Sequence, residues 1–221
     1  MQYAFKPSLA GSRLGPAILV FSLLLLFQVA AQAGGKDTAS SLLRKLPTTI
    51  FDNTSLPLSE DDKEQLLDKG YAGAWVVVKA NPDFLAMSLP DSLDGEVMVR
   101  LFRNGDSRLV VLGATTESTC AAELWSISPK GGLTPEHGPE APPSSDFFRS
   151  GISLPTDISM TTRLCFDGET LEIKPLFWNK KGPVHLNVHF RVLCHWDGTN
   201  FTRKEIIPIE TKPTGEARKT P

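Results

Sequence analysis

The longest alternation of apolar and polar residues in the chain runs from Val184 to Trp196. Every even-numbered position in this run is apolar, and the odd positions are mostly polar and include three histidines. Successive side chains of a β-strand point to opposite faces, so the pattern predicts one long strand with one buried face. Asp197-Gly198 follows directly and predicts a hairpin whose return strand begins at Phe201.

Further strands are predicted between residues 74 and 127. Apolar runs at 97–102 and 109–112 flank Asn104-Gly105, a second hairpin signal. The run at 109–112 is apolar at four consecutive positions, which predicts a strand covered on both faces. Shorter apolar runs at 74–78 and 121–127 predict two more strands, and Asn81-Pro82-Asp83 predicts a turn after the first of them.

A third hairpin is predicted around Asp167-Gly168. A two-residue turn there would place Leu164 opposite Leu171, and Arg163 opposite Glu172 as a cross-strand pair of opposite charge. The segment Leu-Cys-Phe-Asp-Gly before this turn is similar to Leu-Cys-His-Trp-Asp-Gly before the last turn. The likeness covers five or six residues, which is too short to establish a duplication.

Two short helices are predicted ahead of the strands. The first is predicted over residues 40–46, because Pro47 directly after them stops a helix. Residues 60–69 follow Ser59 as N-cap, carry acidic residues in the first turn and precede Gly70 at the C-terminal cap. The predicted fold class is therefore mainly β, with antiparallel sheets in a sandwich-like arrangement and one or two N-terminal helices, α+β at most.

The N-terminus has the pattern of a secretory signal peptide. Lys6 and Arg13 are its only charges, an apolar run covers 17–27, and Ala31-Gln32-Ala33 is a cleavage motif before Gly34. The alternative is an uncleaved anchor, but residues 16–33 contain three polar side chains and are marginal for a spanning helix. We expect export to the periplasm or the extracellular space, with no stable membrane span after cleavage.

The remaining chain divides by composition. Residues 128–157 are rich in Pro, Gly and Ser. A loop of this length marks either a subdomain boundary or a functional loop. Phe147-Phe148 is its main apolar patch and is expected to pack against the rest of the domain. The predicted division is a signal peptide at 1–33, an α+β part at 34–127, a loop or linker at 128–157, an antiparallel meander at 158–207 and a loose tail at 208–221.

Composition and charge narrow the classes of partner. The chain is 41% hydrophobic and 22% charged, which is typical of a globular protein. Cleavage at residue 33 removes two of the 23 basic residues and none of the 25 acidic ones, which leaves a net charge of about −4. This charge gives no electrostatic reason to expect nucleic acid or an anionic membrane surface as partner.

Three cysteines suggest one disulfide and one thiol in an oxidising compartment. In a simple meander Cys165 and Cys194 would lie two strands apart, nearly 10 Å, beyond disulfide reach. A bridge that involves Cys120, or none, is therefore favoured, while Cys194 is expected to be a small buried hydrophobe. Sequons at Asn53 and Asn200 matter only if the source cell has an endoplasmic reticulum.

Histidines are the main candidates for chemistry. His185, His189 and His195 share one face of the predicted strand, but roughly 13 Å and 20 Å would separate successive members, too far for one metal ion. His137, beside Glu136 in the Pro-rich loop, is a candidate ligand contact or base. The sequence contains no familiar nucleotide-binding, nucleophile or zinc motif, and we predict no metal and no cofactor.

Four tryptophans are candidates for ligand contact. A strand tryptophan is more often packing, and this is the interpretation for Trp75, Trp125 and Trp196. Trp178 lies in a segment that predicts a loop and is the candidate exposed contact. The predicted function is a non-enzymatic exported binding or interaction module with an envelope or extracellular partner. The alternative is a hydrolase or metal-dependent enzyme built around His137 or the three-histidine face.

Overall fold

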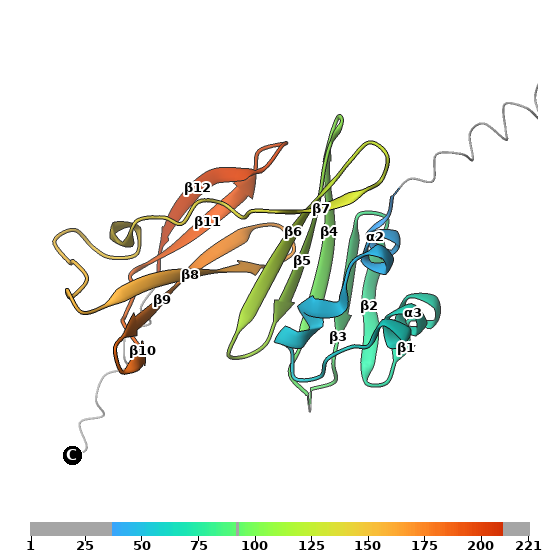
Figure 1. Ribbon diagram of the computed structural model, residues 1–221, viewed down its shortest axis with the longest axis horizontal. Coiled ribbons are helices and arrows are strands. Elements are labelled where there is room, and N and C mark those ends of the chain that lie inside the picture. The colour runs from blue at the N-terminus through green and yellow to red at the C-terminus, as the bar shows by residue number, and fades with distance from the viewer. Residues whose placement is uncertain (1–36, 92, 210–221) are drawn as a thin grey trace, which may run out of the picture. The chain divides into compact units, whose positions relative to one another are not determined.

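The computed structural model describes residues 37–91 and 93–209 (Figure 1). From Asp37 onward these residues form one compact unit. The predicted signal peptide at 1–33 and nearly all of the predicted tail at 208–221 lie outside the described residues, so both stay predictions.

The first sheet in the described chain has seven antiparallel strands in chain order. Figure 1 labels them β1 to β7. The turn predicted at Asn81-Pro82-Asp83 and the hairpin predicted around Asn104-Gly105 are both present, and Gly105 has the positive φ of 58° that the hairpin turn needs. The strands are β1 (Tyr71–Ala72), β2 (Trp75–Asn81), β3 (Phe84–Ser88), β4 (Glu96–Asn104), β5 (Ser107–Thr115), β6 (Cys120–Ile127) and β7 (Leu133–Glu136).

The second sheet is built around β9. Strand β8 pairs along nearly all of β9, so β10 and β11 share the opposite edge of β9 in succession, and β12 follows β11. The described elements confirm the predicted class, mainly β with antiparallel sheets and few short helices. The strands are β8 (Ser159–Phe166), β9 (Leu171–Asn179), β10 (Gly182–Val184), β11 (Phe190–Trp196) and β12 (Phe201–Pro208).

The N-terminal helices begin and end close to where their caps predict. The Ser59 hydroxyl accepts a hydrogen bond from the Asp62 amide at 3.1 Å, and Gly70 ends the helix in the left-handed conformation with φ of 81°. The short 3₁₀ turns were not predicted. The helical elements are α2 (Ala39–Lys45), η1 (Thr48–Asn53), α3 (Glu60–Lys69) and, later in the chain, η2 (Ser144–Asp146).

The first sheet lies between two hydrophobic cores. One face packs against α2, η1 and α3, and the other packs against the second sheet and the loop that precedes it. Strand β5 divides the two cores: Val110 and Leu112 belong to the first, and Leu109 and Val111 to the second. All four side chains are at most 5% exposed, which confirms the prediction of a strand covered on both faces.

A disulfide joins the two sheets. Cys120 on β6 and Cys165 on β8 are bonded, with their Cα atoms 5.2 Å apart. Cys194 has no sulfur partner among the described residues and is buried in the second core. The pairing that the sequence left open therefore involves Cys120, and Cys194 packs as the small hydrophobe expected of it.

The predicted register of the third hairpin is wrong. Its loop has four residues instead of two, so Phe166 pairs with Leu171, and Arg163 lies opposite Lys174 instead of Glu172. The carboxylate of Asp167 organises the longer loop by accepting the amides of residues 169 and 170 at 2.9 and 2.7 Å. The loop at 197–200 is built in the same way around Asp197, which explains the similarity between the two segments.

The Pro-rich stretch at 128–157 contains more regular structure than predicted. Residues 133–136 form β7, which pairs with β6, and 144–146 form η2. Phe147 and Phe148 are 0% and 7% exposed in the second core, so they pin the stretch to the body as expected.

The long strand predicted from Val184 to Trp196 is wrong as a single element. Residues 182–184 form β10 and 190–196 form β11, and the segment 185–189 between them belongs to no strand. The buried side was predicted correctly, because Val192 and Cys194 are at most 2% exposed. The interruption is the feature that shapes the candidate site.

Candidate functional site

A groove opens where the predicted strand is interrupted. The ladder between β10 and β9 ends with Val184 opposite Phe177, and the ladder between β11 and β9 begins with Val192 opposite Ile173. Seven residues, 185–191, therefore lie between the two ladders opposite only three, 174–176. The four-residue excess leaves the edge of β9, and the groove between it and β9 has a volume of about 420 Å³.

The groove is lined mainly by apolar side chains. They come from β9, from β10 and from the intervening residues 185–191, called the excursion below, and Ile209 closes one side. A volume of this size lies within the range of roughly 300–1,000 Å³ typical of small-molecule sites, which are likewise mostly apolar. The lining includes Leu176, Trp178, Pro183, Leu186, Val188 and Phe190.

Trp178 presents an aromatic surface at one end of the groove. Its side chain is 41% exposed, and its indole Nε1 donates to the hydroxyl of Thr161 at 3.2 Å. Pro183 is its direct cross-strand neighbour. The exposure is as expected, but the residue lies on β9 and not in a loop. Because the indole is held by Thr161, little side-chain entropy remains to be lost when a ligand packs against it.

Charged side chains occupy the other end. Glu172 accepts two hydrogen bonds from Arg191, at 2.8 Å from Nε and 3.1 Å from Nη2, and the ammonium of Lys174 is 3.8 Å from the same carboxylate. The hydrogen bond with Glu172 raises the pKa of Arg191 and outweighs the opposing effect of partial burial. Glu172 and Trp178 are six residues apart on one strand, so roughly 20 Å separates the two ends.

The candidate histidines do not come together. His185 is exposed at the groove, while His189 is half-buried in an edge-to-face arrangement with Phe148, and its Nδ1 has no hydrogen-bond partner among the described residues. His195 contacts Glu205 through Nε2 at 2.7 Å, and His137 is exposed after β7, outside the groove lining. The shared strand face predicted for the first three is wrong, because the strand is interrupted between 184 and 190.

No metal centre is evident in the described part of the chain. Across residues 37–91 and 93–209, no three His, Cys, Asp or Glu side chains are placed to share an ion. None of the helices described there is both long enough and apolar enough to cross a membrane.

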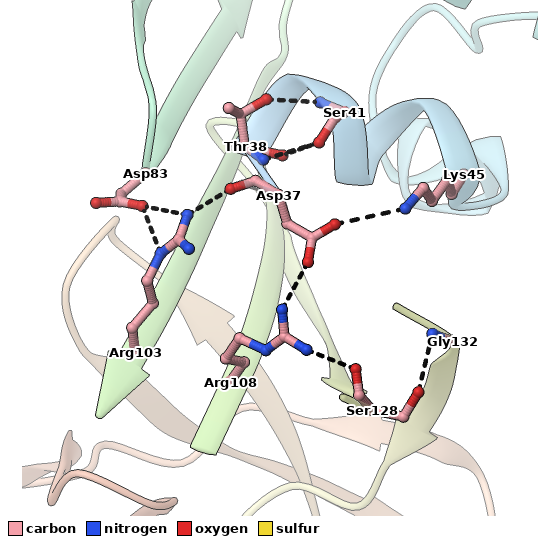
Figure 2. Close-up of polar contacts among 9 residues, drawn as sticks. All are labelled: Asp37, Thr38, Ser41, Lys45, Asp83, Arg103, Arg108, Ser128 and Gly132. Carbon is pink, nitrogen blue, oxygen red and sulfur yellow. Dashed lines mark hydrogen bonds and ion pairs between the residues drawn. The ribbon is translucent and has the colours of Figure 1, made fainter. Parts of the chain in front are cut away.

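A second polar cluster fixes the start of the described chain, as Figure 2 shows. The Asp37 carboxylate lies 2.8 Å from Arg108 and 3.5 Å from Lys45, while Arg103 pairs with Asp83 at 2.9 Å and also donates to the Asp37 carbonyl. Arg103 and Arg108 are cross-strand neighbours on the β4–β5 hairpin. Their charges are matched by these two carboxylates, so the cluster attaches α2 to the hairpin and offers no open anion site.

Sequence reasoning missed both the groove and this cluster. The groove depends on a difference in residue count between two facing segments, and the cluster joins residues such as Asp37 and Arg108 that are 71 positions apart. Comparison with known proteins gives no lead: no family model matches the chain, and no curated protein or solved structure is detectably similar to it.

Proposed function

We propose that the mature protein is an exported, non-enzymatic binding module that takes an apolar ligand into the groove beside Trp178. The observation that carries the proposal is the groove itself, an apolar hollow of about 420 Å³ with an indole fixed at its rim. An apolar ligand that displaces water from such a surface gains about 25 cal/mol for each Å² buried, less the cost of its immobilisation.

Export is supported by the residue pattern at 1–33 and by the disulfide between Cys120 and Cys165. Disulfides form and persist in oxidising compartments, whereas cytosolic thiols are kept reduced. Expression of the full chain in a host with a secretory pathway, followed by N-terminal sequencing, tests this part of the proposal. A start at Gly34 supports cleavage and export, and retention of residues 1–33 would favour the anchor instead.

The enzymatic alternative has no comparable support. His185 and His189 share the segment 185–189, whereas His137 follows β7 and His195 lies on β11, and of the four only His185 is among the described residues that line the groove. Nucleic acid is not proposed as a partner either, because the mature chain is mildly acidic.

Ligand binding is tested with a fluorescent apolar probe. N-phenylnaphthylamine is expected to bind the mature protein, and Trp178→Ala is expected to weaken binding about tenfold, or about 1.4 kcal/mol. Tyr71→Ala is the matched control, since Tyr71 is 55% exposed on β1, outside the groove lining. Equal binding by both variants and the parent would place the probe elsewhere and count against the proposal.

A further inference from the structure

The strand register places three cations in a row on one face of the second sheet. Arg163 on β8 lies directly opposite Lys174 on β9. Arg191 precedes Val192, the first β11 residue that pairs with β9, so it stands beside Lys174 on the other side. Like charges on adjacent strands repel one another, and they remain adjacent only at a cost unless an anion lies between them.

Among the described residues, one carboxylate pairs directly with this row and two more lie nearby, one of which, Asp167, also attracts Arg191 electrostatically. Glu172 is the one carboxylate within ion-pair distance of it, bound to Arg191 and 3.8 Å from Lys174, while Arg163 donates to the hydroxyl of Thr119. Glu96 and Asp167 line an adjoining hollow. They form no ion pair with the row, and the Asp167 oxygens accept hydrogen bonds from their own loop. The Lys174 ammonium therefore keeps donors for a further acceptor.

The row and the apolar groove are continuous. Lys174, Leu176 and Trp178 alternate along β9, so their side chains point to the same face, and all three line the groove. Lys174 and Trp178 are four residues apart, roughly 13 Å along the strand. The site thus passes from a cationic end to an apolar and aromatic end over a distance that suits an elongated molecule.

An added peptide strand fits this site less well. Residues 174–176 form the stretch of β9 without a partner on the groove side, and Pro175 lies at its centre. The stretch is only three residues long and Pro175 has no N–H to donate, so it offers a docking strand few backbone hydrogen bonds. Recognition by side chains, with the head group on cations and the body on apolar groups, accounts for the lining instead.

We infer that the ligand of the groove is an elongated amphiphile with a carboxylate head, which binds at Lys174 between Arg163 and Arg191 while its hydrocarbon chain lies along Trp178. This inference rests on the proposed function and names the ligand class. A carboxylate is the acceptor that ammonium and guanidinium groups bind with short, charge-assisted hydrogen bonds.

The test compares dodecanoate with dodecanol by calorimetric titration of the mature protein, below the concentration at which either aggregates. We expect tighter binding of dodecanoate, and about a tenfold loss of that binding in Lys174→Gln with dodecanol unaffected. Lys181→Gln is the matched control, an exposed lysine in the β9–β10 turn outside the groove lining. Trp178→Ala is expected to weaken the binding of both compounds.

The outcomes separate this inference from the function on which it rests. If both compounds bind equally and Lys174→Gln changes neither, while Trp178→Ala weakens both, the groove binds apolar molecules but the carboxylate is not recognised, and the inference is overturned. If neither compound binds, the proposed function fails together with it. Raised salt is expected to weaken only the binding of dodecanoate, because screening acts on the charged contact.

Discussion

The buried lysine of α3 is an exception to the rule that charged side chains lie at the surface. Lys63 is 1% exposed in α3, although lysine is almost never fully buried without a partner. Its ammonium donates to the Leu46 carbonyl at 2.5 Å and pairs with Glu60 at 2.5 Å. It lies three positions before Leu66 and so shares that residue's face. The caps of this helix could be predicted from Ser59 and Gly70, but this burial could not, because the accepting carbonyl belongs to another element.

Asp197 yields a prediction about pH. The hydroxyl of Thr202 and then the amides of Asn200 and Thr199 donate to its carboxylate and hold its pKa well below the usual value. A carboxyl group whose pKa is lower in the folded state stabilises fully above its unfolded value, roughly 3.9, and loses that contribution as the pH falls from there toward the folded pKa.

We therefore expect Thr202→Val to raise the pKa of Asp197 toward its usual value, because the largest single cause of the shift is removed. Titration of the carboxyl carbon by NMR measures this directly. Asp197→Asn is expected to make unfolding free energy less sensitive to pH below about 4. An Asp197 titration curve that is the same in the parent and in Thr202→Val would show that the hydroxyl contributes nothing.

At the scale of elements, the sequence predicts which segments are strands better than how they pair. The positions of the hairpins could be predicted from Asp-Gly and Asn-Gly, since those turns need a residue with a positive φ. The register after Phe166 was missed because the Asp167 side chain accepts two loop amides and so stabilises a four-residue loop. The interruption after Val184 was missed because the alternation of exposure continues from 184 to 188 without a ladder.

The interrupted strand makes a deletion informative. In the present register Val184 lies opposite Phe177 and Val192 opposite Ile173. Removal of residues 185–188 would keep both pairs and place His189 opposite Leu176. Because four is an even number, every remaining side chain keeps its face. We expect the variant to fold with one continuous strand and to lose binding of the apolar probe, since the groove is filled by the new ladder.

That variant also loses Leu186 and Val188, which pack against the second core, so its stability is expected to fall by a few kcal/mol. Circular dichroism and urea unfolding check the fold, and the fluorescence titration checks the groove. A folded deletion variant that binds the probe as the parent does would show that the excursion does not form the binding site.

At the scale of the whole molecule, the strands of the first sheet contribute side chains to both hydrophobic cores. The core under the helices and the core under the second sheet are separated only by the first sheet, and β5 contributes two residues to each. The disulfide between Cys120 and Cys165, 45 positions apart, adds a covalent link between the sheets worth about 4 kcal/mol by loop-closure entropy. The predicted boundary at 128–157 is therefore a change of composition that need not separate two folding units.

This arrangement predicts one cooperative unfolding transition. Leu112→Ala removes a side chain from the first core, and Leu109→Ala removes one from the second, on opposite faces of the same strand. Each is expected to cost about 2–5 kcal/mol and to accelerate global hydrogen exchange in both sheets equally, because losing either core exposes strands that the other requires. If Leu112→Ala accelerates exchange in the first sheet and leaves β8–β12 protected, the two parts fold independently, and the groove belongs to a separable C-terminal domain.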